Sequence, residues 1–336
     1  MEVLIERLRQ HLPDLGKRLA VGSKALVSHG KPRGKRTASS RPDGRRDLDA
    51  DWGMKTYKGT DKNGMVWEKI KRWFGYKLHL VVDAKYEVPL AYTVTRASAN
   101  DSPQLLPMIE NLRQRHPELV ERAEYLSADK AYDSEENNKT LWDEYAIRPV
   151  IDIRHTWKEE PGQPRPLYPD RVDTIFYTEQ GQVLCRCRDN GQQERDNYTS
   201  MAREGFEAGR MGLKYRCPAK ARGIVCTQQA FCNRGRQPEH GRIVRVPLGM
   251  NRRVFTPLAR DTRAWTREYR YRTAVERVNS RFQLNFGFER HYIRGLNKTR
   301  LRAGLALMVM LGMAVGWIES GKPGQLRSLV GRARAA

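Results

Sequence analysis

The sequence has few acidic side chains for the number of basic ones. It carries 62 lysines and arginines against 39 aspartates and glutamates, which gives a formal net charge of +23. Such an excess attracts anionic partners, and nucleic acid is the natural one. The cations are spread along the chain, with a dense run from Gly30 to Arg46 and further arginines beyond Arg267. This distribution favours a long electrostatic footprint over a short localisation signal.

Long apolar runs are also missing. The longest, Ala303 to Ile318, has 16 residues, fewer than the roughly 20 that span a bilayer. We therefore expect a buried helix there and no membrane partner. The first twenty residues have the pattern of a short amphipathic helix with charges throughout, not the continuous apolar core of a secretory signal. The sequence thus predicts a cytoplasmic protein.

Cysteine is scarce, and its number is odd. Five cysteines in a chain without export features argue against a disulfide framework. They are enough for a tetrahedral zinc site, although their spacing is not that of two C-x2-C pairs. The alternative is reduced, partly buried cysteines in a small β subdomain. The five are Cys185, Cys187, Cys217, Cys226 and Cys232.

Apolar residues alternate in several segments of the first half, as in half-buried strands. The predicted strands are Arg18–Ser28, Tyr76–Asp83, Val88–Thr95, Tyr125–Ala128 and a last one around residues 147–153. Two helices interrupt them. The first follows Asp101 or Ser102 as its cap, and the second follows Asp133 or Ser134. Strands and helices in this order predict a mixed sheet with helices, an α/β core.

The pattern changes between about His155 and Trp265. Prolines, glycines and the cysteines concentrate there without a long periodic stretch, which is typical of an insertion. From Arg267 to Phe286 the chain is helical by pattern, and the apolar helix near residues 303–318 follows. We expect these helices to cover the sheet.

Two acidic residues lie at positions that suit a catalytic role. Asp129 follows a buried strand, where α/β sheets present functional groups, although an Asp there can simply cap the next turn. Tyr269, Arg272 and Glu276 are spaced to share one helix face. The simpler interpretation of Glu276 is an exposed ion pair with Arg272, worth about 0.3–0.5 kcal/mol.

Several motifs together resemble the DDE transposases of bacterial insertion sequences. They are "WFGYKLHLVVDA", "ASANDS", "SADKAYDS", "LKYRCPA", "FTPLARDTRAW" and "YRYRTAVERVNSRFQLNFGFERHYIRG". The resemblance covers nearly the whole chain and implies an RNase H-like mixed sheet flanked by helices. It also implies that a cysteine-containing, largely β or irregular insertion interrupts this core.

The resemblance divides the chain into five segments. They are a residual N-terminal helix at 1–17, the first part of the core at 18–154, the insertion at 155–265, the C-terminal core helices at 266–320 and a basic tail at 321–336. The family usually carries a further helical domain at the N-terminus. We therefore expect either that Met1 is an internal start or that the gene is truncated.

The family holds two Mg²⁺ ions, or Mn²⁺, with two Asp and one Glu, and uses them to hydrolyse phosphodiesters and transfer strands. Asp129 matches the second acid and Glu276 the third. The implied DNA contacts are Tyr269, Arg272, Lys130 and Gln283, the last of which stands where the family has a lysine.

The first acid of the family is missing. The opening strand reads "LAVGSKAL" where the family has a context like "LAVDGKAL", so Gly22 occupies the position of the Asp. We predict that this copy is impaired, because a glycine supplies no metal ligand. The other acids that could substitute are Asp47, Asp49, Asp51, Asp83 and Asp101, and the resemblance gives none of them that role.

Three functions remain open at this point. The first is a DNA transposase that acts as a homo-oligomer on double-stranded transposon ends and target DNA. The second is an inactive, truncated derivative that binds DNA or intact transposase. A structural RNA-binding protein would explain the charge but not the contexts of Asp129 and Glu276.

Overall fold

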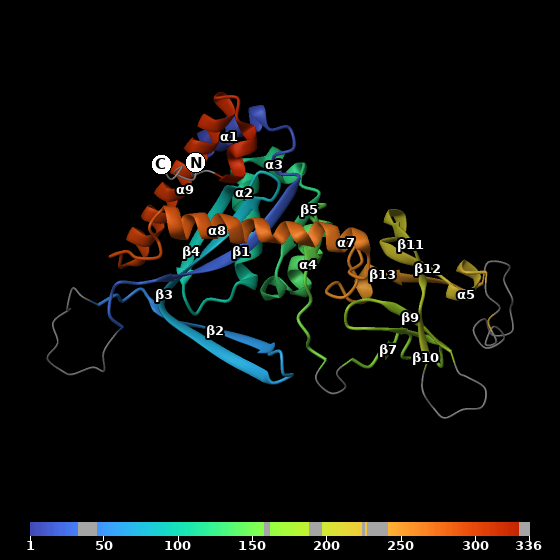
Figure 1. Ribbon diagram of the computed structural model, residues 1–336. Coiled ribbons are helices and arrows are strands. Elements are labelled where there is room, and N and C mark those ends of the chain that lie inside the picture. The colour runs from blue at the N-terminus through green and yellow to red at the C-terminus, as the bar shows by residue number, and fades with distance from the viewer. Residues whose placement is uncertain (33–45, 158–161, 188–196, 224–225, 227–240, 329–336) are drawn as a thin grey trace. The chain divides into compact units, whose positions relative to one another are not determined.

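The computed structural model describes residues 1–32, 46–157, 162–187, 197–223, 226 and 241–328. The chain divides into two compact units, Met1–Tyr132 with Arg270–Ala336 (unit 1), and Asp133–Tyr269 (unit 2). Figure 1 labels the elements of both units. The insertion that we expect at residues 155–265 stays a prediction.

Unit 1 contains the sheet that the strand patterns predict. Its elements are α1 (Glu2–His11), β1 (Arg18–Val27), β2 (Asp51–Thr60), β3 (Val66–Asp83), β4 (Val88–Arg96), η1 (Ser102–Gln104), α2 (Leu105–Arg115), α3 (Pro117–Glu121), β5 (Tyr125–Ala128), η2 (Lys130–Tyr132), η5 (Arg270–Arg272), α8 (Thr273–Asn285), α9 (Leu296–Glu319) and η6 (Pro323–Ser328).

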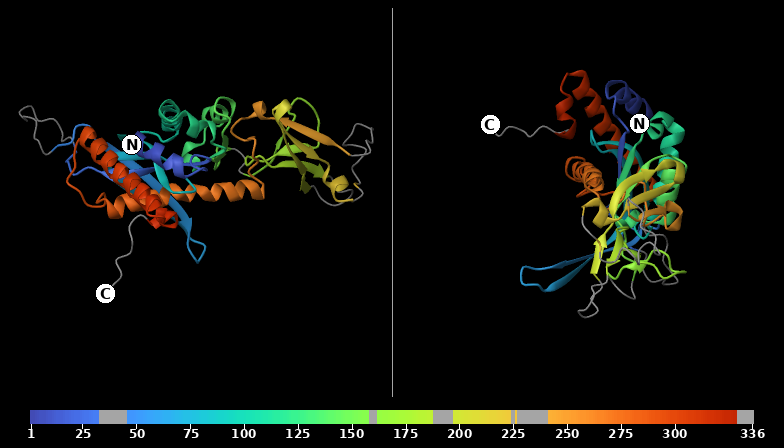
Figure 2. Two further views of the ribbon diagram at one scale, coloured as in Figure 1. Left: turned by 90° about the horizontal axis from the view of Figure 1, so that it is seen from above. Right: turned by 90° about the vertical axis from the view of Figure 1, so that its right-hand side faces the viewer.

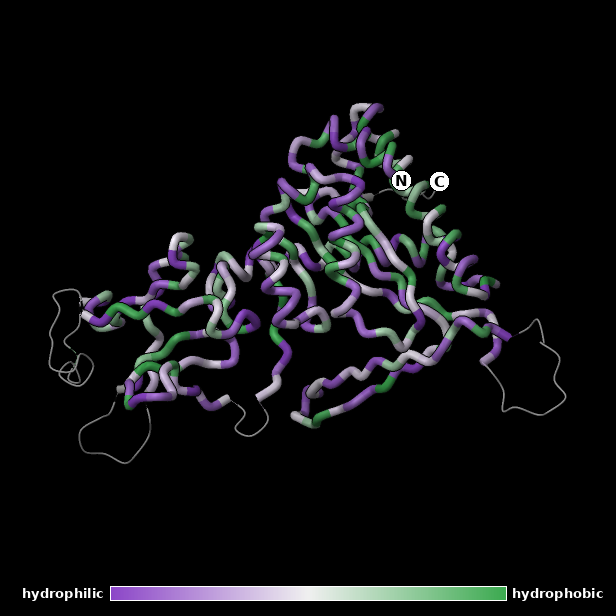
Figure 3. Tube along the Cα trace, turned by 180° about the vertical axis from the view of Figure 1, so that it is seen from behind, coloured by the Kyte–Doolittle hydropathy of each residue, from purple (hydrophilic) through white to green (hydrophobic). Residues whose placement is uncertain are grey.

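The sheet of unit 1 is mixed. Strand β1 runs antiparallel to β3 and parallel to β5, and β4 pairs with β3. Helix α8 packs against β1 and β3, and α9 packs against β4 and α1 (Figures 1 and 2). The predicted α/β class is therefore confirmed, and a mixed sheet flanked by helices is consistent with an RNase H-like fold. Figure 3 shows the hydrophobic strands gathered inside this unit.

The two faces of this sheet differ in chemistry. Side chains alternate along a strand, so Gly22 on β1 lies on one face and Ser23 on the other. A Cβ on Gly22 would meet α8, and a Cβ on Gly304 of α9 would meet Tyr92 of β4. Because Gly22 and Tyr92 both pair with Leu80, α8 and α9 cover the same face.

Strand β2 was absent from the sequence prediction, and β3 is longer than predicted. Residues 66–75 of β3 pair with β2, and residues 75–83 pair with β1. The two strands form a ribbon that extends beyond the other strands of unit 1 (Figures 1 and 2). Its side chains are mostly exposed on both faces, so no buried stripe distinguished it from a loop.

The predicted caps were only partly correct. Ser134 caps α4 (Glu135–Asp143) and accepts a hydrogen bond from the Asn137 amide. Asp101 stands before η1 but makes no capping bond with its side chain. The Asp101 carboxylate is instead engaged by residues of the sheet, as described below.

Unit 2 is built from short strands around its own hydrophobic core. Its elements are α4, β6 (Arg148–Ile151), β7 (Arg165–Pro166), β8 (Ile175–Tyr177), β9 (Val183–Cys187), β10 (Asn197–Ser200), β11 (Ala202–Glu207), η3 (Ala208–Arg210), β12 (Gly212–Arg216), α5 (Pro218–Ala221), β13 (Ile243–Pro247), η4 (Leu248–Met250) and α7 (Arg263–Tyr269). Apart from β6, the strands form two antiparallel sheets, β10-β9-β8-β7 and β11-β12-β13.

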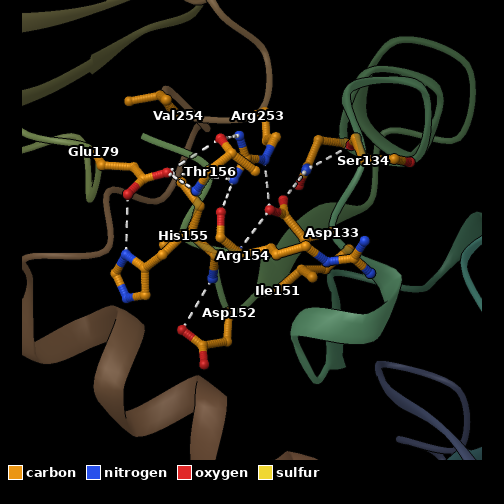
Figure 4. A network of polar contacts seen from close by, with 12 residues as sticks. Asp133, Ser134, Ile151, Asp152, Arg154, His155, Thr156, Glu179, Arg253 and Val254 are labelled. Carbon is orange, nitrogen blue, oxygen red and sulfur yellow. Dashed lines mark hydrogen bonds and ion pairs between the residues drawn. The ribbon is translucent and has the colours of Figure 1, made fainter. Parts of the chain in front are cut away.

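A network of polar contacts fastens the loops of unit 2 (Figure 4). Arg253 donates from Nε to Asp133 Oδ2 (2.6 Å) and from Nη1 to Thr156 Oγ1 (2.8 Å). Glu179 accepts hydrogen bonds from the amides of Thr156 and Trp157. Because Asp133 and Glu179 have several donors each, the network joins residues 21 to 120 positions apart in the chain.

Candidate active site

The two parallel strands β1 and β5 bring the first two acid positions together. Val21 pairs with Ala128 in register, so Gly22 and Asp129, each the next residue, are neighbours at the same edge of the pair. The carboxyl ends of parallel strands are where α/β sheets present functional groups. The sequence motifs around both positions therefore meet in space, although they are 107 residues apart in the chain.

Gly22 is buried beneath α8 and has no room for a side chain as the structure stands. An ideal Cβ at this position would lie 2.8 Å from Cγ1 and 3.3 Å from Cγ2 of Val275. Real Cβ contacts are longer than 3.0 Å, so a side chain here requires Val275 to shift. The isopropyl group of Val275 thus fills the space beside the strand position at which we predict the first acid.

Glu276 follows Val275 on α8 and is engaged by an arginine. Its Oε1 accepts a hydrogen bond from Arg272 Nη1 at 2.6 Å, and its side chain is 57% exposed. An exposed pair of this kind contributes about 0.3–0.5 kcal/mol. The simple ion-pair interpretation of Glu276 therefore holds in this structure, and the small energy leaves the carboxylate available to another cation.

Asp129 is half-buried after the end of β5. One carboxylate oxygen accepts a hydrogen bond from the amide of Ala131 at 2.8 Å, which turns the chain into η2. The turn-capping interpretation of Asp129 is thus observed as well. A single amide donor leaves lone pairs on both carboxylate oxygens.

Asp101, which lies in the motif "ASANDS", is one of the alternative acids. Its carboxylate already accepts hydrogen bonds from two other residues. Its Oδ2 accepts from Ser23 Oγ (2.7 Å), and its Oδ1 accepts from Lys77 Nζ (2.9 Å). Ser23 points to the face of the sheet opposite Gly22. The Asp101 carboxylate therefore belongs to a polar cluster on the far face.

The other four alternative acids also have structural partners. Asp47 accepts from Tyr76 and Ser28, and Asp83 accepts from the amides of the β3–β4 turn. Asp49 accepts from the amide of Leu296, and Asp51 accepts from Ser98. Burial raises the pKa of Asp83 to about 6, as expected for a carboxyl in the core. None of the five lies free beside Gly22.

The predicted DNA contacts are dispersed over several elements. Tyr269 ends α7 and stacks on Trp265, with ring centroids 4.6 Å apart. Arg272 lies in η5, Gln283 is half-buried near the end of α8, and Lys130 is exposed. The helix expected over residues 267–286 is thus interrupted by a 3-10 turn at Arg270–Arg272, so these residues do not share one uninterrupted helix face. Their contact with DNA stays a prediction.

The cysteine prediction can be followed only in part. Cys185 is buried in β9, and Cys217 precedes α5. Cys232 and the side chain of Cys187 lie outside the described residues. Zinc binding by these residues therefore stays a prediction.

Among the described residues, one group could hold a metal ion by the spacing of its ligand atoms. Glu6, His116 and Glu118 bring one ligand atom each within 4.8 Å of one another. Arg9 already pairs with Glu6 and, at 3.4 Å, with Glu118. This group lies on α1 and α3 with the residue between α2 and α3, and includes none of the predicted catalytic acids.

Asp129 and Glu276 do not by themselves fit the metal site that the family uses. They supply two carboxylates in place of three, and Glu276 is paired with Arg272. Gly22 adds no ligand, and Val275 lies where a side chain at position 22 would be. Sequence motifs located the acids, but they gave no sign of Val275, because its contact with Gly22 depends on how α8 packs.

Comparison with known proteins identifies the family. The family model "Transposase DDE domain" matches residues 42–311, well over half of the chain. That match begins after β1, so it does not reach Gly22. A protein of Burkholderia cepacia described as "Putative transposase for insertion sequence element IS402" is 40% identical over 87 residues.

The aligned segment covers 24% of this chain and 39% of that relative. No solved structure matches the chain. Divalent metals are general for the matched family, and DNA transposition is its function. The family model, the relative and the mixed sheet agree, and the chain therefore belongs to the DDE transposases of insertion sequences.

Proposed function

We propose that this chain binds DNA as an insertion-sequence transposase and that its phosphodiester hydrolysis and strand transfer are impaired at Gly22. The observation that carries the proposal is the contact between the Gly22 position and Val275. A carboxylate is missing there, and a valine side chain lies 2.8 Å from where its Cβ would be. The defect is therefore both a lost ligand and a filled space.

Two further observations support the impairment. Each alternative acid near β1 is held by partners of its own, so replacing the missing carboxylate would break existing hydrogen bonds. Glu276 is paired with Arg272. Asp129, beside Gly22, accepts its hydrogen bond from a backbone amide and not from a cation.

The alternative is a derivative that binds DNA or intact transposase and catalyses nothing. The same absence at Gly22 favours it, because a net charge of +23 maintains affinity for DNA whether or not the chemistry survives. The proposed partners are double-stranded transposon ends and target DNA, bound by a homo-oligomer in the cytoplasm. Mg²⁺ or Mn²⁺ is the proposed ion, and structural zinc is proposed for the cysteines.

A cleavage assay with four variants tests the proposal. The substrate is a labelled duplex of the transposon end, taken from inverted repeats that flank the gene, with Mg²⁺ or Mn²⁺. The variants are Gly22→Asp, Val275→Ala, their combination, and Glu276→Gln. We expect the unmodified chain to nick no faster than Glu276→Gln, and Gly22→Asp to gain at most part of the activity because Val275 crowds the new side chain.

The double variant Gly22→Asp with Val275→Ala should nick the duplex faster than Gly22→Asp alone, since alanine removes both Cγ atoms of Val275. The expected gain over the unmodified chain is at least about 100-fold, because changes in the second shell of metal sites alone cost about 10–100-fold. Val275→Ala alone serves as the control for loosened packing and should gain nothing. Nicking by the unmodified chain at the rate of the Gly22→Asp variants would refute the impairment, and absence of nicking in every variant, with DNA still bound, would favour the non-catalytic alternative.

A further inference from the structure

The ribbon of β2 and β3 has two faces of different character. Paired residues of antiparallel strands lie on the same face, so the register assigns each side chain. One face, which we call the lysine face, carries Lys55, Tyr57, Trp67, Lys69 and Lys71. The opposite face carries Trp52, Met54, Thr56, Lys58, Val66, Glu68, Ile70 and Arg72.

The lysine face carries no acidic side chain between Gly53 and Gly59 of β2 or among the residues of β3 paired with them. Lys55 pairs directly with Lys71, and Tyr57 pairs with Lys69. On the opposite face Lys58 is neutralised by Glu68 at 2.9 Å. Residues 53–59 and 67–73 thus give the lysine face cations without an acidic side chain, whereas the opposite face carries Glu68 together with Lys58 and Arg72.

This arrangement costs stability in the isolated chain. Like charges directly opposite each other on two strands are destabilising, and a two-stranded ribbon is only marginally stable. Lysines on an edge strand do discourage aggregation, but that purpose does not require two of them to face each other. An anionic partner lying on this face would relieve the repulsion.

Aromatic rings complete the lysine face. A Cβ on Gly59 would lie 2.5 Å from the Trp67 ring, and one on Gly53 would lie 2.4 Å from the Trp73 ring. Each ring therefore lies against the bare backbone of its partner glycine. Trp67 is still 45% exposed, and Lys55 lies 5.7 Å from the ring centroid of Tyr57. The result is a flat surface with cations beside exposed rings.

Positive charge is also found where the ribbon joins β1. Besides burial, the ammonium groups of Lys71 and Lys55 lower the pKa of Lys24, so the three charges are close enough to repel. Lys24 pairs with Leu78 and lies on the face of β1 that carries Gly22, whereas alternation along β3 puts Lys71 on the other face. The cations of the ribbon therefore lie near the strand that carries the candidate active site, although they belong to different faces of the sheet.

We propose that the lysine face of the β2–β3 ribbon binds the phosphate backbone of duplex DNA and guides it toward the edge of β1 and β5. The dimensions suit this partner. Ten residues of strand extend over about 30 Å at about 3.4 Å each, and a two-stranded ribbon fits the major groove, about 12 Å wide. The inference rests on the proposed function, since it names the element that holds the DNA.

Two triple variants with equal loss of charge test the inference. Lys55→Gln, Lys69→Gln and Lys71→Gln neutralise the lysine face. Lys58→Gln, Lys62→Gln and Arg72→Gln remove three charges from the opposite face and the turn. The affinity of the full chain for a 30-base-pair duplex is measured between low and moderate salt, with circular dichroism to verify folding and a single strand of equal length as a second ligand.

Each phosphate contact contributes about 0.9 to the slope of log affinity against log salt. We expect the lysine-face triple to lower this slope by about 2–3 and to weaken binding at least tenfold, and the matched triple to lower it by less than 1. Equal losses in both triples would overturn the assignment to one face. Loss of single-strand binding alone would overturn the duplex as partner, and an unmodified chain that binds no DNA would also overturn the proposed function.

Discussion

Position 22 illustrates how one residue changes the environment of another. In the sequence Gly22 stands where we predict the first acid, and Val275 is an apolar residue of a predicted helix. In the structure the two residues are in contact, because α8 packs on β1. Replacing the glycine therefore affects two side chains, and this is why the Val275 variant belongs in the cleavage assay.

His79 lies on the opposite face of the same sheet. It is fully buried, and its Nε2 lies 2.9 Å from Thr95 Oγ1. Burial lowers the pKa of His79 to about 4, with the Asp101 carboxylate opposing this shift and the Lys77 ammonium adding to it. A buried, neutral histidine in this position is a core residue.

This shift predicts a pH dependence of stability. In the unfolded chain the pKa of histidine is near 6.5, so between about pH 6.5 and 4 the unfolded state binds more protons than the folded state. The free energy of unfolding should therefore fall as the pH falls through this window, by up to about 3 kcal/mol. Urea unfolding of the unmodified chain and of His79→Gln at pH 4.5 and 7 measures the effect, and parallel pH curves for the two proteins would contradict it.

At the scale of elements, α8 is tied to the turn between β3 and β4. Glu87 in that turn is 2% exposed and accepts from Arg277 Nε (2.6 Å) and Arg281 Nη2 (3.1 Å). Arg281 Nη2 also donates to the Glu87 carbonyl oxygen at 2.9 Å. These bonds hold the helix that carries Val275 and Glu276 against the sheet.

Removing the charge of Glu87 should loosen α8. Breaking a buried ion pair at one partner costs about 3–5 kcal/mol, because the other charge stays buried without compensation. We expect Glu87→Gln to lower the free energy of unfolding by about 3 kcal/mol in urea titrations. Glu68→Gln is the matched control, since its pair with Lys58 is exposed and such pairs contribute about 1 kcal/mol or less. Similar losses in both variants would show that Glu87 does not anchor the helix.

At the scale of the whole molecule, the apolar C-terminal segment forms α9, and the question is whether this helix belongs to a protein core or to a membrane. Within the described residues it is a helix long and apolar enough to cross a membrane. One side of it packs on β4 and α1, with Gly304 allowing close approach to Tyr92. The other side keeps Leu305 and Val309 about half exposed. A helix with a buried and an exposed side is typical of a protein core.

Two adjacent positions at the same depth of α9 distinguish a core helix from a membrane span. Met310 is fully buried and Val309 is 53% exposed. Met310→Asp should lower the free energy of unfolding by about 4 kcal/mol or more, because it buries an unpaired charge, and Val309→Asp should change it by about 0.5 kcal/mol. Circular dichroism during urea unfolding measures both. In a bilayer the two aspartates would lie at one depth and cost about the same, so equal effects would contradict a core helix.

Local sequence was sufficient for much of the core. The alternation from Tyr125 to Ala128 predicted β5 with its observed bounds, and Ser134 was one of two predicted caps. Motifs predicted a catalytic role for Asp129 and Glu276, because residue types at fixed spacing need no knowledge of packing, and that role stays a prediction. The family assignment followed from the same motifs.

Tertiary structure determined which side chains contact such residues. Asp101 caps nothing with its side chain, because Ser23 and Lys77 from the sheet offer it charged and hydroxyl donors. The sequence did not predict strand β2 of the ribbon, because both faces of the ribbon are exposed. A strand is recognised in a sequence by the apolar stripe of its buried face. Gly22 and Val275 are 253 residues apart in the chain, so only the packing of α8 on β1 reveals that a side chain at position 22 would meet Val275.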